Sequence, residues 1–126
     1  MRKICVVVGS RANYSSIKSA MLAIQEHADQ ELQLVLGASA LLDRYGEVAQ
    51  LIKKDGFKAA EEVFMLIEGE TPVTMAKSTG VGIMELSTVF QRLSPDIVLT
   101  VGDRFETMAT ALAAAYMNIA VAHTMG

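Results

Sequence analysis

The chain has 126 residues, and a domain of about this size buries roughly two-thirds of the surface that its unfolded chain exposes. Its composition is 52% hydrophobic and only 6% aromatic, which suits a core of aliphatic side chains and methionine. A formal net charge of -3 argues against nucleic acid as a partner. Cys5 is the only cysteine, so we expect a buried structural thiol, no disulfide framework and a reducing, cytoplasmic setting. No apolar run reaches about 18 residues, so no membrane span is expected.

Strand and helix signals alternate along the first half of the chain. A buried strand is expected at 4–8, then a polar loop that runs to Ser15, then a helix capped by Ser15 or Ser16. Further strands are expected at 32–36 and 62–67, with a short helix between them at 46–54.

The longest predicted helix covers residues 72–93. Thr71 can cap this helix, and proline suits its first position. Ser94-Pro95 ends the helix before the next strand. Gly80 and Gly82 each cost about 1 kcal/mol relative to alanine in a helix interior. They indicate either a kink or close packing against a neighbouring element.

The last third of the chain predicts one βαβ unit. Residues 97–101 form a short apolar run suited to a strand buried on both faces, a helix begins near Phe105, and an apolar strand ends at His123. Together with the earlier elements, the order βαβαβαβαβ predicts an α/β domain with a parallel sheet covered by helices on both faces.

Polar side chains follow the carboxyl ends of the predicted strands, where open α/β sheets bind their ligands. Asp103 and Arg104 come directly after Gly102, which ends the buried strand 97–101, and His123 closes the next strand at the same edge. Asp103 and Arg104 are candidates for the chemistry of this edge. The alternative is that they only cap a helix and keep the surface soluble.

A second candidate site is the turn after the first strand. The P-loop pattern and the Gly-x-Gly-x-x-Gly fingerprint are both absent from the sequence. The first strand instead leads into Gly9-Ser10-Arg11, where backbone N–H groups and a helix dipole favour an anion, and where Arg11 can add a bidentate contact. The alternative is an ordinary surface loop with a solvated arginine.

Five blocks of sequence occur in a characteristic order along essentially the whole chain. They are Gly9-Ser10-Arg11-Ala12-Asn13-Tyr14, the run from Glu70 to Ser78, the run from Arg92 to Ile97, Val101-Gly102-Asp103-Arg104-Phe105-Glu106, and the run from Asn118 to His123. Together these blocks resemble the hydrolysing UDP-N-acetylglucosamine 2-epimerases, which are the sialic-acid pathway enzymes and their bacterial relatives.

The resemblance implies two Rossmann-like domains, as in the GT-B glycosyltransferases, with a UDP-sugar in the cleft between them. Residues 1–126 would then be the first domain, and the second, nucleotide-binding domain would lie outside this chain. The reaction implied is loss of UDP to a glycal-like intermediate, followed by addition of water to give N-acetylmannosamine. Neither a cofactor nor a metal is expected.

The resemblance also assigns site residues. Asp103 matches the acid/base carboxylate of the family, and Arg104 matches its neighbouring arginine. Arg11 and Ser15 match the first loop, which faces the nucleotide. We add His123, at the neighbouring strand end, as a substrate-binding residue.

Three positions depart from the usual pattern of the family. Asn13 stands where relatives usually have aspartate, Ala40 where they usually have histidine, and Met125 where a second catalytic group is expected. Because the second domain would lie outside this chain and a second catalytic group is lacking, we expect the isolated chain to be inactive. The alternative function is a non-catalytic half-domain that binds a sugar nucleotide or pairs with the missing half or with a second copy. A flavodoxin-like signalling receiver is disfavoured, because the first strand leads into Gly-Ser-Arg in place of an acidic pair.

Overall fold

The computed structural model describes residues 1–37, 47–65, 69, 71–102 and 104–124. Over these residues, strands and helices alternate without exception. The elements are β1 (Arg2–Val8), α1 (Arg11–Glu26), β2 (Gln30–Gly37), α2 (Glu47–Lys54), β3 (Ala59–Val63), α3 (Pro72–Leu93), β4 (Ile97–Val101), α4 (Phe105–Tyr116) and β5 (Ala120–Thr124). None of the helices within these ranges has both the length and the apolar character that crossing a membrane requires.

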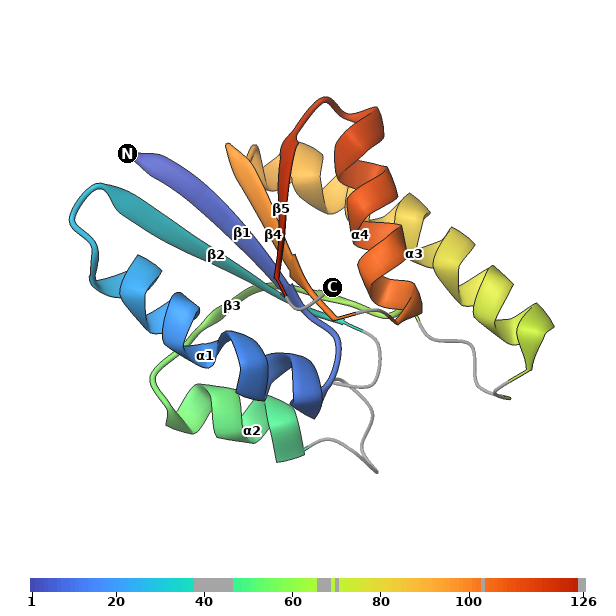
Figure 1. Ribbon diagram of the computed structural model, residues 1–126, viewed down its shortest axis with the longest axis horizontal. Coiled ribbons are helices and arrows are strands. Elements are labelled where there is room, and N and C mark those ends of the chain that lie inside the picture. Colours follow the sequence, from blue (N-terminus) through green and yellow to red (C-terminus); the bar gives the residue numbers. More distant parts are fainter. Residues whose placement is uncertain (38–46, 66–68, 70, 103, 125–126) are drawn as a thin grey trace.

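The strands form one sheet in the order β3-β2-β1-β4-β5, and every neighbouring pair is parallel. Helices α1 and α2 cover one face of the sheet, and α3 and α4 cover the other (Figure 1). The predicted parallel sheet with two helical layers is confirmed. Because all strands run the same way, their carboxyl ends lie on one edge of the molecule, toward the bottom of Figure 1.

Strand β1 lies at the centre of the sheet and contributes to both cores. Ile4, Val6 and Val8 pack toward α1 and α2, whereas Cys5 and Val7 pack toward α3 and α4. Successive strand residues point to opposite faces, so a strand covered on both sides must be apolar throughout. Burial raises the pKa of the Cys5 thiol to about 12, which keeps it neutral and unreactive at physiological pH. The buried structural thiol is confirmed.

Helix α1 begins earlier than the sequence predicted. Ser10 is its cap, in an extended conformation, and the Ser10 hydroxyl accepts a hydrogen bond from the Asn13 N–H at 3.1 Å. The expectation that Ser15 or Ser16 caps this helix is wrong, because both lie inside α1. Several serines follow β1, and only the backbone geometry at Ser10 decides which of them satisfies the free N–H groups of the first turn.

Strand β3 is also displaced from its predicted place at 62–67. It covers Ala59–Val63 and pairs with β2, where Val63 lies opposite Gly37. Phe64, directly after the strand, is 73% exposed. The run from Glu62 to Ile67 suggested a strand, of which residues 66 and 67 lie outside the described residues, but register with β2 determines which residues pair at this outer edge of the sheet.

Close packing, and not a kink, explains one of the two glycines in α3. A Cβ atom on Gly82 would lie 2.8 Å from the Cβ atom of Ala109 in α4, so the absence of a side chain lets the two helices approach each other. Gly80 is exposed and has no atom within 4 Å of the same position. Helix α3 runs through both residues without interruption.

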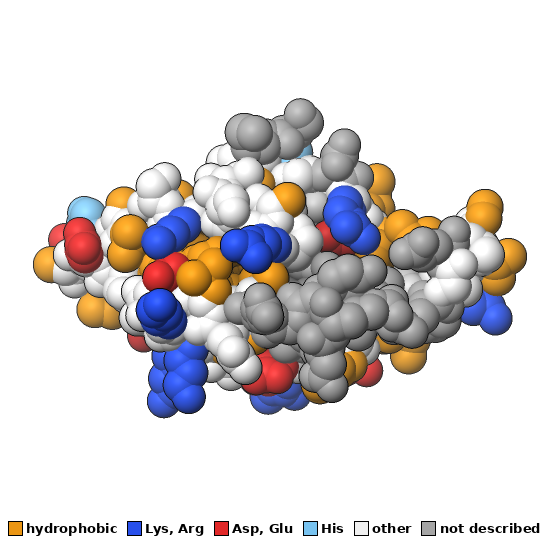
Figure 2. Space-filling model, turned by 90° about the horizontal axis from the view of Figure 1, so that it is seen from below, with side chains coloured by type: hydrophobic (Ala, Val, Ile, Leu, Met, Phe, Trp, Pro, Cys, Tyr) orange, Lys and Arg blue, Asp and Glu red, His pale blue; other side chains and the backbone are white. Residues whose placement is uncertain are grey.

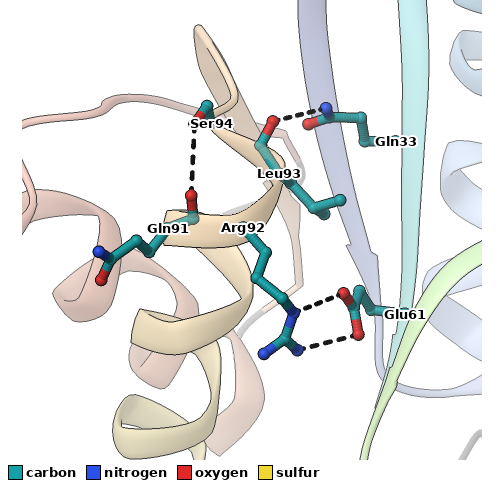
Figure 3. A network of polar contacts seen from close by, with 6 residues as sticks. All are labelled: Gln33, Glu61, Gln91, Arg92, Leu93 and Ser94. Carbon is teal, nitrogen blue, oxygen red and sulfur yellow. Dashed lines mark hydrogen bonds and ion pairs between the residues drawn. The ribbon is translucent and has the colours of Figure 1, made fainter.

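A polar network attaches the end of α3 to β2 and β3 (Figure 3). Arg92 makes a bidentate pair with Glu61, with its Nε and Nη2 atoms 2.9 and 3.0 Å from the two carboxylate oxygens. Gln33 donates from Nε2 to the carbonyl of Leu93 at 2.9 Å. Ser94 then ends the helix in the left-handed conformation, at φ 48°.

A second polar cluster joins α1 to the end of α2 and supports a testable pH effect. The Tyr14 hydroxyl donates to Asp55 at 2.5 Å, and Lys18 lies 3.0 Å from the same carboxylate oxygen. The bond from Tyr14, followed by that from Lys18, holds the pKa of Asp55 below its usual value. Asp55 therefore stabilises the fold above its unfolded-state pKa, and this stabilisation is lost as the pH falls through the lower folded-state pKa.

Replacing Tyr14 by phenylalanine is expected to raise the pKa of Asp55 toward its usual value, because the variant removes the first of its two hydrogen-bond donors. Carboxyl NMR titration of both proteins measures the shift directly. Tyr116→Phe is the matched control, since Tyr116 is 84% exposed. An unchanged Asp55 titration in Tyr14→Phe would show that the hydroxyl does not bind the carboxylate in solution.

Candidate active site at the carboxyl edge of the sheet

The turn from β1 into α1 forms the first wall of the candidate site. The Gly9 N–H donates to the side-chain oxygen Oδ1 of Asn13 at 3.1 Å. A Cβ atom on Gly9 would clash with Cγ of Glu106, so the turn packs directly against α4. Arg11, the first residue of α1, is exposed. Its position at a helix N-terminus is one where backbone N–H groups and the helix dipole favour an anion.

Arg11 also borders a hollow of about 270 Å³ at the surface between α1 and α2. The other lining residues are Gln50, Leu51 and Lys54 of α2. Two cationic side chains therefore line this hollow, and none of its lining residues in the described part of the chain is acidic. Figure 2 views the molecule from below, toward the edge where the strands end, and shows several Lys and Arg side chains on this face.

The turn from β4 into α4 forms the second wall. Gly102 has φ +89°, a conformation that favours glycine, and its N–H donates to the carbonyl of Thr124 at 3.3 Å. The predicted turn at Gly102 is confirmed. Arg104 occupies the cap position of α4 but makes no capping hydrogen bond through its side chain. Its Nε atom instead lies 3.6 Å from Oε1 of Glu106.

The ion pair between Arg104 and Glu106 joins a buried group to an exposed one. The Glu106 side chain is only 2% exposed, whereas the Arg104 side chain is 51% exposed. A buried carboxylate requires compensating partners, and a nearby arginine is one of them. The guanidinium therefore lies beside Glu106 at the carboxyl edge of the sheet, and part of it stays exposed to solvent. This arrangement leaves Arg104 able to contact an anion.

His123, near the end of β5, contacts the second wall. Its Nε2 atom lies 2.7 Å from the Gly102 carbonyl oxygen. A carbonyl only accepts hydrogen bonds, so Nε2 is the donor in this contact. The prediction that the ends of the last two strands are neighbours is confirmed, because β4 pairs with β5 and Val101 lies opposite Thr124.

The structure thus brings most of the predicted site residues to one edge. Arg11 begins the helix that follows the first turn, and Arg104 and His123 lie at the second. Ser15 is exposed but lies within α1, beyond the loop in which the sequence placed it. Asp103, the predicted acid/base residue, lies outside the described residues, as do Ala40 and Met125.

Two further residues of the site were not singled out from the sequence. In the sequence, Glu106 stood out only as the last residue of the block that begins at Val101, and Asn13 only as a member of the first block that departs from the family pattern. The signal for Glu106 was a single acid in a helix that is otherwise apolar and alanine-rich. For Asn13 it was an amide four residues after a strand-end glycine, a spacing that lets the side chain bond back to that glycine.

Comparison with known proteins decides the family of this chain. The sequence model of the UDP-N-acetylglucosamine 2-epimerase family matches residues 22–126. The chain belongs to this family. A UDP-N,N'-diacetylbacillosamine 2-epimerase (hydrolyzing) from Legionella pneumophila is 32% identical over 126 residues, which are all of this chain and 33% of that protein.

Solved epimerase structures share the fold. A crystal structure of a UDP-N-acetylglucosamine 2-epimerase superimposes with a TM-score of 0.85 at 25% identity, over 98% of this chain and 33% of the other. The Neisseria meningitidis enzyme, solved with bound UDP-GlcNAc, gives a TM-score of 0.81 at 25% identity, over 96% of this chain and 31% of the other. The present epimerase-family chain therefore spans about a third of the length of the relatives that it matches.

Proposed function

We propose that residues 1–126 are the amino-terminal domain of a hydrolysing UDP-N-acetylglucosamine 2-epimerase, and that the carboxyl edge of the sheet faces the UDP-sugar. The observation that carries this proposal is the meeting of the β1 and β4 turns, which places Arg11 and Arg104 at one edge. Arginine binds phosphate oxygens through a planar fork of donors, and its charge does not titrate. We also propose that the protein is located in the cytoplasm, as the sequence suggested.

The proposed reaction has two steps. First, the proton on C2 of the sugar is removed while the bond from C1 to the UDP oxygen breaks, which leaves a glycal-like alkene. Water then adds across this double bond, with hydroxyl to C1 and a proton to the opposite face of C2, to give N-acetylmannosamine. Asp103 is the proposed acid/base group, and proton transfer by a positioned side chain typically contributes about 10²–10⁴-fold. Arg11 and Arg104 would stabilise the charge that develops on the departing diphosphate.

We expect the isolated 126-residue chain not to turn over UDP-GlcNAc. In the proposed enzyme a second domain closes over the sugar, and without that closure the reacting groups lose both alignment and exclusion of water. The test is an assay of UDP release by the purified chain, with Asp103→Ala as the background. UDP release that Asp103→Ala abolishes would overturn the expected inactivity and would establish Asp103 as catalytic.

Binding of UDP tests the anion site separately from catalysis. We expect millimolar UDP to shift the amide NMR signals of Gly9 and Gly102, and Arg11→Ala to weaken binding by roughly tenfold, since a hydrogen bond to a charged group is worth about 1.5–3 kcal/mol. Arg2→Ala is the matched control, because Arg2 is the first residue of β1 and therefore lies at the amino end of the strand whose carboxyl end leads to Arg11. Equal UDP affinity in both variants would exclude Arg11 from the site.

Our second proposal is that the chain is a non-catalytic half-domain, which pairs with the remaining part of an epimerase. All five residues of β5 are exposed, although this strand was expected to be an ordinary apolar strand of the sheet. In this proposal the rest of the epimerase covers β5. Size-exclusion chromatography of the chain, alone and mixed with the remaining two-thirds of a family member, detects the complex. An assay of UDP release by that complex then distinguishes the two proposals. Catalysis restored in the complex supports the first, and an inactive complex supports the second.

A further inference from the structure

Asn13 is a buried polar residue between the two turns that form the site. It is 6% exposed, and it contacts Gly9, Ser10 and Gly102 in these turns. Its backbone N–H donates to the Ser10 hydroxyl, and its side-chain Oδ1 accepts from the Gly9 N–H, each at 3.1 Å. One residue therefore closes the cap of α1 and also fixes the last peptide of the β1 turn. A buried side chain bonded in this way has little rotational freedom.

The other end of the same amide lies against the β4 turn. Its Nδ2 atom is 3.0 Å from the position that a Cβ atom on Gly102 would occupy. The φ of +89° at Gly102 favours glycine, and the Asn13 amide also occupies the space that a side chain at Gly102 would need. Gly102 is also the residue whose N–H bonds to Thr124 and whose carbonyl bonds to His123. A movement of Asn13 would therefore be passed to the ends of β4 and β5.

Glu106 makes a parallel contact between the same two turns. It lies against Gly9 on one side and pairs with Arg104 on the other. The two walls are thus connected twice, once through an uncharged amide and once through a carboxylate.

We propose that Asn13 is a positioning residue that sets the distance between the β1 and β4 turns, and thereby lets Arg11 and Arg104 reach the same anionic group. The inference rests on the proposed function of this edge. It differs from a purely structural role in one respect: a substitution at Asn13 must shift the amide NMR signals of Gly102 and Arg104 in a protein that is still folded.

The test combines amide NMR spectra with UDP titration of the 126-residue chain. Asn13→Ala, studied below its unfolding midpoint, is expected to shift the amide signals of Gly9, Gly102 and Arg104 and to weaken UDP binding by roughly tenfold, since misplacement by about 1 Å can cost 10²-fold in a reaction. Asn13→Asp keeps the acceptor for the Gly9 N–H, so it is expected to retain the Gly9 signal and most of the affinity. Ser16→Ala, on the exposed side of α1, is the control.

The reciprocal variant keeps the proposal testable if Asn13→Ala does not fold. Gly102→Ala pushes a methyl group against the Asn13 amide, and it is expected to shift the Gly9 signal across the site. Folded variants that leave the opposite turn unshifted would overturn the positioning role, even if wild type binds UDP. Failure of wild type to bind UDP, with the cross-site shifts present, would instead overturn the proposed function and leave the coupling of the two turns established.

Discussion

Replacing Phe90 by alanine is expected to lower the free energy of unfolding by about 3–5 kcal/mol, the usual cost of removing a buried phenylalanine. Phe90 is 1% exposed and lies in the core between the sheet and helices α3 and α4. Its ring packs in the same cluster as Cys5 of β1 and Val98 of β4. The truncation removes apolar contacts and leaves a cavity that the rigid sheet cannot close. A domain of ordinary stability, about 5–15 kcal/mol, would lose a large part of it.

Met84→Ala on the same helix is the control for Phe90→Ala. Met84 is 71% exposed, so its truncation should change the free energy of unfolding by no more than about 0.5 kcal/mol. Urea denaturation of wild type and both variants, with equal m-values, provides the comparison. If the two variants were equally stable, α3 could not pack on the sheet in the orientation described.

The two glycines of α3 are expected to respond in opposite directions to the same substitution. Gly80→Ala should raise the free energy of unfolding by about 1 kcal/mol, because alanine is the better helix former and its methyl group meets open space. Gly82→Ala receives the same gain in helix propensity, but its methyl group lies 2.8 Å from the Cβ atom of Ala109 and 3.2 Å from Sδ of Met65. The methionine can move aside, whereas the alanine moves only with its helix.

The difference between these two alanine variants isolates the cost of the clash. Helix propensity is common to both and cancels, so Gly80→Ala should exceed Gly82→Ala in stability by about 1–3 kcal/mol, the usual cost of overpacking. Thermal and urea unfolding of the two variants measure this difference. A double variant, Gly82→Ala with Ala109→Gly, should recover the part of the loss that comes from the clash, less about 1 kcal/mol for the new glycine inside α4. Equal stabilities for the single variants would contradict the close approach of α3 and α4.

Some of the site could be predicted because local signals are enough to specify it. Gly102 follows an apolar run, and its positive φ agrees with the turn that the sequence predicts there. Parallel strands share a carboxyl edge, so Arg11, Arg104 and His123 could be assigned to one side of the sheet before any coordinates were considered. The contact between His123 and the Gly102 carbonyl follows from the pairing of β4 with β5.

Other features could not be predicted, because they depend on residues far apart in the chain. The burial of Glu106 results from the approach of Gly9, almost a hundred positions earlier. The start of β3 depends on its register with β2, and register is a property of two strands together. Likewise, the sequence alone does not distinguish a helical glycine that faces solvent, such as Gly80, from one that faces another helix, such as Gly82.

The sequence by itself determined the order of strands and helices, the parallel sheet and the edge on which its polar residues gather, because periodicity, capping residues and strand-end glycines act over a few neighbouring positions. Only the tertiary structure decided that Ser10 caps α1, that Asn13 and Glu106 connect the two turns of the site, and that Gly82 lets α3 meet α4. The contacts of Asn13 and Glu106 arise because β1 and β4 are paired side by side, which brings together turns that the chain separates by the length of three helices.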